Sequence, residues 1–327
     1  MKYTWIDTDA GIDDALAILV TLKNTQVLGI SLSFGNCPQH MVLRNVTRIL
    51  SAFLEQHPEY PVPMLCLSAA HSHSKLVKKD CDKADYDCWH GHDGMGDVPD
   101  FEASHGKVVR EFQLTDFASS VQKAIDFANS KNQVLTVLSI GPLTAVKMLL
   151  EKNISNYNLI TMSCAFPALF PASNSPGNMS SFNQPNSEHN IACDVESAAY
   201  VFDHAKQITV IDWNFTLTYY LSQPELQILN SHNTYLSEFH AQISQHLTTK
   251  LLESGNEQYL CCDACAAHFH FIQNNKPFES QKGTVKIITE DGENFGQSVF
   301  TQGEGNAEII ISYERDEFVK TLVNCVI

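Results

Sequence analysis

Four aspartates stand within eight residues near the start of the chain, in the stretch DTDAGIDD at residues 7–14. Four carboxylates at close range repel one another and raise one another's pKa values unless a cation lies among them. One of them could cap a following helix, and the positive end of that helix could favour a second. Capping therefore explains one or two of the four, and the cluster predicts a metal site. Ligands that are all oxygen favour Ca²⁺ or Mg²⁺ over Zn²⁺.

Two other patterns are weaker signals for metal ligands. HSH at 71–73 and HFH at 268–270 have the composition of zinc-type pairs, but the second lies in a predicted helix, where residues two apart point in different directions. CCDAC at 261–265 also suggests thiolate ligands, yet Asp263 within it is better explained as a further carboxylate of the aspartate metal site.

An aspartate pair at the end of a first strand is also compatible with a haloacid-dehalogenase-type phosphatase, in which Asp7 would be the nucleophile. That interpretation needs a downstream lysine and a further acidic pair in the right order. GDVPD at 96–100 is the only candidate for the acidic pair, and it comes too early in the chain.

The elements that must position these residues follow from the alternation of short β-rich runs with longer helical ones. This pattern predicts an α/β fold, a mostly parallel mixed sheet with helices on both faces. Sites in such open sheets form beyond the carboxyl ends of the strands, where the aspartates stand. We expect strands over 2–6, 27–34, 134–140, 158–163 and 207–211, a buried helix over 13–23, a helix ending near Leu54, and another with Pro142 at its first position. After residue 283 we expect two strands around Asp291-Gly292, another strand from Ala307, and a last helix to Val323.

Two irregular segments interrupt this alternation. Residues 164–185 are rich in Pro, Ser, Asn and Gly and are predicted to form a binding loop, because the segment is too long for an idle connection. Residues 69–106 are also irregular, with WHGHDGMGD at their centre. Without an internal repeat or a linker, the pattern predicts one domain over residues 1–327.

Composition excludes several classes of protein. The net charge of −16 argues against binding to nucleic acid or to an anionic membrane surface, because like charges repel. No signal peptide is apparent, and no apolar run reaches the roughly 18 residues that span a bilayer. The ten cysteines are then expected to be free thiols in a reducing compartment, which predicts a cytoplasmic protein.

The aspartate motif belongs to a longer series. DTDAGIDDA at 7–15 resembles the DTDPGIDDA signature of the inosine-uridine-type nucleoside hydrolases, with Ala10 where proline is usual. Further segments resemble that family in the same order along the chain: SFGN at 33–36, HGHDGMG at 90–96, SIGPLTA at 139–145, GN at 177–178 with SEHN at 187–190, and CDA at 262–264. The last is similar to the branch of the family that has cysteine where others have histidine or tryptophan.

The resemblance implies a Ca²⁺-dependent enzyme that hydrolyses the N-glycosidic bond of purine or pyrimidine ribonucleosides to free base and ribose. A metal-bound water would be activated by Asp9, and an oxocarbenium-like ribosyl cation would form in the transition state. The expected partners are a small nucleoside and further copies of the chain, as a homodimer or homotetramer. The implied metal ligands are Asp9, Asp14, Asp263 and the backbone carbonyl of Ile140, and the implied ribose contacts are Asp13, Asn36, Met162, Asn178, Glu188 and Asn190.

The residue types leave local alternatives open for several of these positions. Asn36 and Asn178 could be turn residues, and Asp263 could be a helix N-cap. Glu188 and Asn190 lie two apart, so they would share one face of an extended stretch. Asp7 is expected to orient a neighbouring group or a water.

Contacts with the base are the least determined. His90 could contact the base, protonate it, or support its loop. His189 stands where an aromatic residue is usual, and MSC at 162–164 stands where Met-Gly-Gly is common. Cys262 is a poor proton donor for a purine, since a thiol has a pKa of about 8.5, and a packing role is favoured. A catalytically inactive nucleoside-binding protein is the alternative, which the complete set of implied ligands disfavours. The sequence does not indicate which base is preferred.

Overall fold

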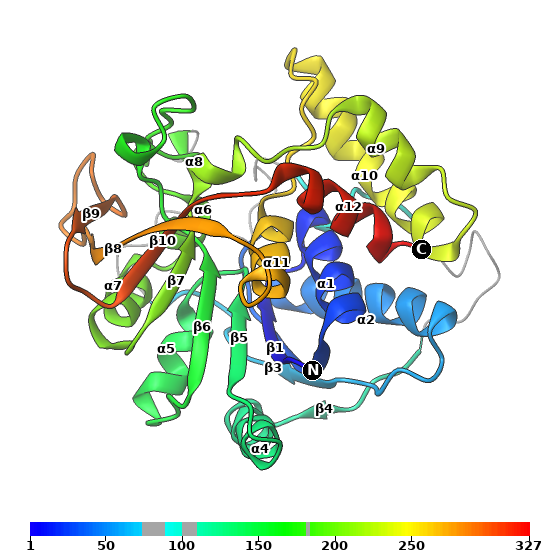
Figure 1. The fold of residues 1–327 in the computed structure, drawn as a ribbon, viewed down its shortest axis with the longest axis horizontal. Helices are drawn as coiled ribbons and strands as arrows, with labels where there is room; N and C mark the ends of the chain where they lie inside the picture. The colour runs from blue at the N-terminus through cyan, green and yellow to red at the C-terminus, as the bar shows by residue number, and fades with distance from the viewer. Residues whose placement is uncertain (74–88, 100–109, 181–183) are drawn as a thin grey trace.

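The computed structural model describes residues 1–73, 89–99, 110–180 and 184–327 (Figure 1). Its strands are β1 (Tyr3–Thr8), β2 (Gln26–Leu32), β3 (Met64–Leu67), β4 (Leu114–Thr115), β5 (Leu135–Ser139), β6 (Tyr157–Met162), β7 (Ile208–Ile211), β8 (Phe278–Ile287), β9 (Ser298–Gln302) and β10 (Ala307–Tyr313). Its helices are α1 (Ile12–Asn24), α2 (Gln39–Gln56), α4 (Phe117–Ser130), α5 (Thr144–Glu151), α6 (His189–Cys193), α7 (Val195–His204), α8 (Trp213–Thr216), α9 (Gln223–Asn230), α10 (Tyr235–Glu253), α11 (Cys262–Ile272) and α12 (Arg315–Cys325), with a 3₁₀ turn η1 (Pro167–Leu169).

The described strands form one sheet in the order β4-β3-β2-β1-β5-β6-β7-β10-β8-β9. The strands from β4 to β10 in this order are parallel, whereas β8 runs antiparallel to β10 and β9 antiparallel to β8. This confirms the predicted mostly parallel mixed sheet. Asp7 at the end of β1 pairs with Ser31 of β2 and Ser139 of β5, so the carboxyl ends of the central strands meet at one edge.

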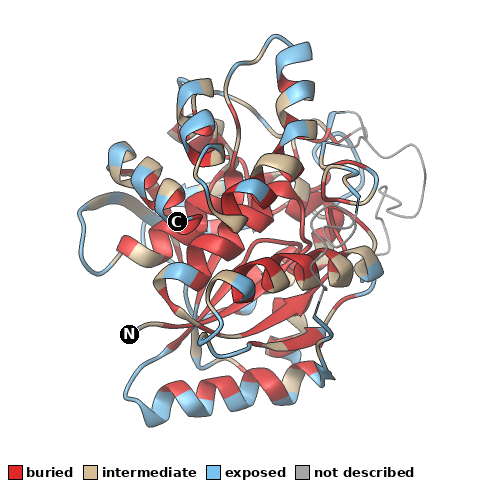
Figure 2. Ribbon diagram, turned by 90° about the vertical axis from the view of Figure 1, so that its right-hand side faces the viewer, coloured by how far each residue is buried: buried red, intermediate tan, exposed pale blue. Residues whose placement is uncertain are grey.

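Two apolar cores cover the two faces of the sheet. One joins α1, α2, α11 and α12, and the other joins α4, α5 and α7. Figure 2 shows that buried residues concentrate in the sheet and in the helices packed against it. Every residue of α1 from Ile12 to Leu22 is buried, as its apolar sequence predicts, because α1 packs against α11, α12, α10 and α2. Among the described residues, no helix is long and apolar enough to cross a membrane.

Some element boundaries differ from the predicted ones. Pro142 is not the first residue of α5, which begins at Thr144 with Leu143 as its N-cap. The first helical hydrogen bond runs from the Lys147 N–H to the Leu143 carbonyl at 3.0 Å, so Pro142 lies one residue before the N-cap. Strand β8 begins at Phe278, five residues before the predicted change at 283, because Phe278 pairs with Tyr313 of β10.

The alternation of apolar residues did not predict β3, β4, α4, or the helices from α6 to α10. The predicted irregular segment 69–106 and the predicted binding loop 164–185 include residues 74–88, 100–106 and 181–183, which lie outside the described residues.

Candidate active site

The turn between β1 and α1 holds Asp14 by hydrogen bonds from its own neighbours. Thr8 Oγ1 donates to Asp14 Oδ1 at 2.5 Å, and the N–H of Gly11 donates to Asp14 Oδ2 at 2.8 Å. The N-cap of α1 is Gly11, and Asp14 accepts from its N–H as the third residue of the helix. An aspartate therefore contributes to the cap from inside the helix and is not the N-cap that was predicted. Between Thr8 and Gly11, Ala10 has a φ of 45°, in the left-handed region, and its N–H donates to Thr8 Oγ1 at 3.1 Å.

Asn36, in the turn that follows β2, joins two of the carboxylates. Its backbone N–H donates to Asp9 Oδ2 at 2.7 Å, and its side-chain Nδ2 lies 3.1 Å from Asp9 Oδ1. The same Nδ2 lies 3.1 Å from Asp14 Oδ2. Both Asp9 oxygens are thus engaged by one residue, and the amide holds two like charges at a fixed separation.

Three carboxylates lie close together at the carboxyl edge of the sheet, those of Asp13, Asp14 and Asp263. One oxygen from each lies within 4.8 Å of the others, and all three residues are buried. Burial, and after it the charge of Asp13, raises the pKa of Asp14 to about 7. Burial also raises the pKa of Asp263 well above its usual range, and the charges of Asp13, Asp14 and Asp9 add to this rise. Asp13 Oδ1 has no hydrogen-bond partner among the described residues. This donor set fits a hard divalent cation, which prefers carboxylate oxygen.

Asp263 reaches this cluster from the first turn of α11, whose N-cap is Cys261, so the alternative role of Asp263 as N-cap is wrong. Asp9 does not belong to the group within 4.8 Å, although its charge acts on Asp263. The Ile140 carbonyl, just beyond β5, lies 3.5 Å from Asn190 Nδ2, which also donates to the Met162 carbonyl at 3.0 Å.

Gly177 brings Asn178 against the segment that carries Glu188. The N–H of Asn178 donates to the Ser187 carbonyl at 3.0 Å, and a Cβ atom on Gly177 would stand 2.3 Å from the Ser187 oxygen. Only glycine allows this approach. It explains why a Gly-Asn pair precedes the segment at 187–190.

Glu188 is the N-cap of α6. Its carboxylate accepts from the N–H groups of Asn190 at 2.9 Å and Ile191 at 3.1 Å. The expectation that Glu188 and Asn190 lie in an extended stretch is therefore wrong, because the helix begins at His189. Both residues still face the same cavity.

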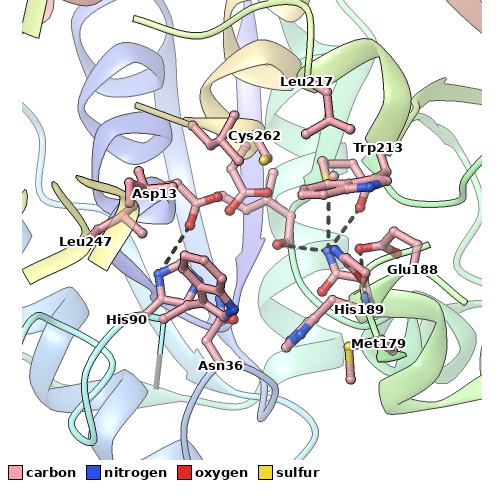
Figure 3. Close-up of a pocket in the computed structure, with 18 of the residues that line it drawn as sticks. Asp13, Asn36, His90, Met179, Glu188, His189, Trp213, Leu217, Leu247 and Cys262 are labelled. Carbon is pink, nitrogen blue, oxygen red and sulfur yellow. Dashed lines mark hydrogen bonds and ion pairs between the residues drawn. The ribbon is translucent and has the colours of Figure 1, made fainter. Parts of the chain in front are cut away.

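That cavity has a volume of about 390 Å³ and is lined by two unlike sets of side chains, which we name by their residues its polar end and its apolar end (Figure 3). Its polar end is lined by Asp13, Asn36, Asn178, Glu188, Asn190 and Asp263, together with Ile140 and Met162. Its apolar end is lined by Trp89, Trp213, Leu217, Leu247, Leu251 and Leu260. Every predicted ribose contact therefore lines the cavity, whereas the residues of the apolar end were not predicted. Two of them had a usable signal, since Trp213 follows a predicted strand at the active edge of the sheet and Trp89 begins the WHGHDGMGD segment.

Three oxygens of the polar end are buried without a hydrogen-bond partner among the described residues: Asp13 Oδ1, Asn178 Oδ1 and Asn190 Oδ1. A buried acceptor without a donor costs about 1–3 kcal/mol. All three are acceptors, so a ligand that supplies hydroxyl groups or a cation would satisfy them.

The three candidate base contacts differ in their placement. His90 Nδ1 accepts from the N–H of Ile12 at 3.1 Å and lies 3.7 Å from Asp13 Oδ1, so the neutral ring carries its proton on Nε2. His189 Nε2 lies 3.8 Å from Asp9 Oδ2, which puts it at the polar end. Cys262 lines the cavity, and burial, then the charge of Asp13, raises its pKa well above the usual range of a thiol.

Asp7 lies behind the cavity and does not line it. Its carboxylate accepts from Ser31 Oγ at 2.6 Å, Ser33 Oγ at 3.0 Å and Ser139 Oγ at 3.4 Å. Burial raises its pKa to about 7, and these serines oppose the rise. A phosphatase nucleophile must face its substrate, so the phosphatase alternative is wrong; Asp100 of its proposed acidic pair lies outside the described residues.

The histidine pair in α11 has structural partners instead of a shared ligand. His270 Nε2 lies 2.8 Å from Thr4 Oγ1, and His268 packs against the rings of Tyr313 and Phe318. Burial lowers the pKa of His268 to about 4 and that of His270 to about 3. Both rings are therefore neutral core residues at physiological pH.

Comparisons with known proteins agree with this geometry. The sequence profile described as "Inosine-uridine preferring nucleoside hydrolase" matches residues 4–320. A probable uridine nucleosidase 2 from Oryza sativa subsp. japonica is 25% identical over 291 residues, which cover 87% of this chain and 78% of that protein. A non-specific ribonucleoside hydrolase RihC from Klebsiella pneumoniae (strain 342) is 27% identical over 260 residues, which cover 79% of this chain and 76% of that protein.

The fold is also that of solved nucleoside hydrolases. An inosine-guanosine nucleoside hydrolase matches with a TM-score of 0.80 at 20% identity, covering 100% of this chain and 99% of that chain. A purine-preferring ribonucleoside hydrolase from Gardnerella vaginalis matches with a TM-score of 0.80 at 18% identity, covering 99% of each. Because the profile match spans nearly the whole sequence, this chain belongs to the inosine-uridine preferring nucleoside hydrolase family and is a hydrolase of the glycosidase class.

Proposed function

We propose that this nucleoside hydrolase uses Ca²⁺ at the carboxylate cluster and cleaves both purine and pyrimidine ribonucleosides to base and ribose. The observation that carries the proposal is the polar end of the cavity. Three buried acceptors without donors lie there beside a group of carboxylates within 4.8 Å. Ribose offers several hydroxyl donors on one small ring, and a divalent cation neutralises clustered carboxylates.

The cation would be held by Asp14 and Asp263, with Asp9, Asp13 and the Ile140 carbonyl at the same end. Calcium is favoured over zinc because the candidate ligands are all oxygen. When bound, the ion would act as a Lewis acid that makes water a stronger nucleophile. The chain's own groups then account for the remaining chemistry.

Asp9 is the proposed base that accepts the proton of the attacking water. It is fully buried, and Asn36 orients both of its oxygens, so its position does not depend on solvent. The cluster as a whole is negative, which favours the positive charge that develops on the ribosyl ring. Asn178, Asn190 and Glu188 would hold the ring hydroxyls.

The base would lie at the apolar end, against Trp213 and the leucines of α10 and its neighbours. Aromatic rings stack on any base and aliphatic side chains pack against it, and neither forms hydrogen bonds that would distinguish one base from another. This composition supports a broad preference. Curated relatives named uridine nucleosidase and non-specific ribonucleoside hydrolase make uridine and inosine the first substrates to compare.

The direct test is ribose release from uridine and inosine by the purified protein. We expect release that EGTA abolishes and that Ca²⁺ restores better than Zn²⁺. Asp14→Ala should lose bound calcium and activity together, whereas Asp203→Ala, an exposed aspartate in α7, should lose neither. Binding of nucleoside without release of ribose would instead establish an inactive binding protein.

We also propose a homodimer or homotetramer and a cytoplasmic location. The eight described cysteines are all free and buried, which suits a reducing compartment. Light scattering of the purified protein and fractionation of cells that contain it test these two proposals separately.

A further inference from the structure

A chain of hydrogen bonds joins the two ends of the cavity. Trp213 Nε1 donates to Ser175 Oγ at 3.1 Å, and Ser175 Oγ donates to the Gly177 carbonyl at 2.8 Å. That carbonyl belongs to the peptide that precedes Asn178. The N–H of the same peptide donates to the Ser187 carbonyl at 3.0 Å, so the peptide is held on both sides.

Asn214, next to Trp213 in α8, fixes the backbone of Ser175. Asn214 Oδ1 accepts from the Ser175 N–H at 2.7 Å, and Asn214 Nδ2 donates to the Ser175 carbonyl at 2.9 Å. Ser173 Oγ also donates to Asn214 Oδ1, at 3.1 Å. Asn214 is fully buried, so water does not compete for these bonds. Ser175 is therefore anchored to α8 by its main chain and by its hydroxyl.

We propose that Ser175 is a positioning residue that links Trp213 at the apolar end to Asn178 at the polar end, so that packing of the base on the indole and binding of ribose by Asn178 are energetically coupled. The inference rests on the proposed function, since it assigns the base to Trp213 and a ribose hydroxyl to Asn178. It goes beyond that function because Ser175, which does not line the cavity, would transmit the effect of the Trp213 contact to the Asn178 contact.

The physical basis is the direction of the bonds. The indole N–H can point at Ser175 Oγ only while the ring keeps its present tilt, and that tilt also presents the ring face to the cavity (Figure 3). The hydroxyl then has its proton free for the Gly177 carbonyl, which fixes the plane of the peptide and with it the Asn178 side chain. Without the hydroxyl, the bond to Ser187 is the one that the described residues still provide to that peptide.

A double-mutant cycle tests this link through kcat and KM for ribose release from inosine. Ser175→Ala should lower kcat about three- to tenfold, the size of one neutral hydrogen bond, with less change in KM and in Tm. In the Asn178→Ala background the same substitution should have almost no effect, because the residue through which it acts is missing. Trp213→Phe keeps an aromatic face and removes the N–H that donates to Ser175. It should lower kcat in the wild-type background and have almost no further effect on kcat in the Ser175→Ala background.

Two variants serve as matched controls. Leu247→Ala changes the apolar end from α10, an element that contributes no residue to the bonded chain, so its effect should be equal in the wild-type and Asn178→Ala backgrounds. Ser173→Ala removes a bond to Asn214 but leaves Ser175 Oγ in place, so kcat should stay near the wild-type value.

Equal effects of Ser175→Ala in both backgrounds would overturn this inference while leaving the proposed function intact. A wild-type protein that releases no ribose overturns both.

Discussion

Asn36 holds the carboxylate of Asp9 from two sides, with its backbone N–H at 2.7 Å and its side-chain amide at 3.1 Å. The amide nitrogen is shared with Asp14, also at 3.1 Å. One neutral residue thereby sets the distance between the proposed base and a proposed calcium ligand. A hydrogen bond to a charged group contributes about 1.5–3 kcal/mol, so this arrangement can be tested by mutation.

Asn36→Ala should lower kcat/KM about 10- to 100-fold, since it removes the side-chain donor and leaves the backbone bond. Asn36→Asp keeps the shape but adds a carboxylate beside two others, and it should be the more damaging of the two. Steady-state ribose release measures both, with Asn129→Ala, exposed in α4, as the control. Activity within twofold of wild type in both variants would contradict this role.

Asp13→Asn should stabilise the protein in EGTA and inactivate it in calcium. Without a cation, the three clustered carboxylates repel one another, and Asp13 Oδ1 has no hydrogen-bond partner among the described residues to lose. We expect the Tm in EGTA to rise by about 2 °C, in the range that about 1 kcal/mol produces in large domains.

Asp203→Asn, exposed in α7, is the matched control and should leave the Tm unchanged. Differential scanning calorimetry measures the Tm of each variant in EGTA and in calcium. A lower Tm for Asp13→Asn in EGTA would show that this carboxylate is stabilised by groups other than a cation.

Cys262 should not protonate the leaving base. Its thiol is buried beside the carboxylates, and its pKa is raised well above the usual range, which makes it a weak acid. Cys262→Ser or Cys262→Ala should cost at most about tenfold in kcat, whereas removing a general acid costs about 10²–10⁴-fold.

The comparison is between inosine and a nitrophenyl riboside, whose leaving group departs without protonation. Loss of more than about a hundredfold on inosine alone would make Cys262 the acid. The same selective loss in His90→Ala or His189→Ala would assign the acid to that histidine. His189 Nε2 lies 3.8 Å from Asp9 Oδ2 and His90 Nδ1 lies 3.7 Å from Asp13 Oδ1, so both rings adjoin the carboxylates and both variants are needed.

The stability of the fold should depend on Asp212, the N-cap of α8. Burial raises the pKa of Asp212 to about 7 from an ordinary 3.8, although the N–H groups of Phe215 and Phe166 donate to it. Between these values the folded state keeps a proton that the unfolded chain has lost. The contribution of Asp212 to the free energy of unfolding therefore decreases as pH rises from about 4 to 7.

Asp212→Asn should remove that decrease, so its free energy of unfolding should change less across this range than that of the wild type. Urea unfolding at several pH values measures the slope. Asp116→Asn is the control, because hydrogen bonds from Ser119 lower the pKa of the exposed Asp116, which therefore titrates below the range. Equal slopes in wild type and Asp212→Asn would mean that Asp212 stays ionised in the folded protein.

How much of the site could be predicted from sequence depends on how its residues reach the cavity. Asp13 and Asp14 are neighbours in one motif on one helix, so local geometry brings them together. Asp263 and Asn178 come from distant segments, and only the resemblance of whole motifs associated them with the aspartates.

The apolar end was not predictable in the same way. Leu247 and Leu251 lie one turn apart on α10, and any amphipathic helix shows such a pair. Their position over the cavity depends on how α10 packs, which periodicity does not determine. The two hydrogen bonds from Asn36 to Asp9 could not be predicted either, because they depend on side-chain rotamers in two separate turns.

Ala10 affects how this sequence can change in evolution. Its φ of 45° and its donated hydrogen bond to Thr8 are both denied to proline, whose φ is fixed near −65° and which has no N–H. Ala10→Pro would therefore move the backbone between Asp9 and Asp14 in a single step. The motif of this chain accepts the proline of the family signature only with compensating changes elsewhere in the turn.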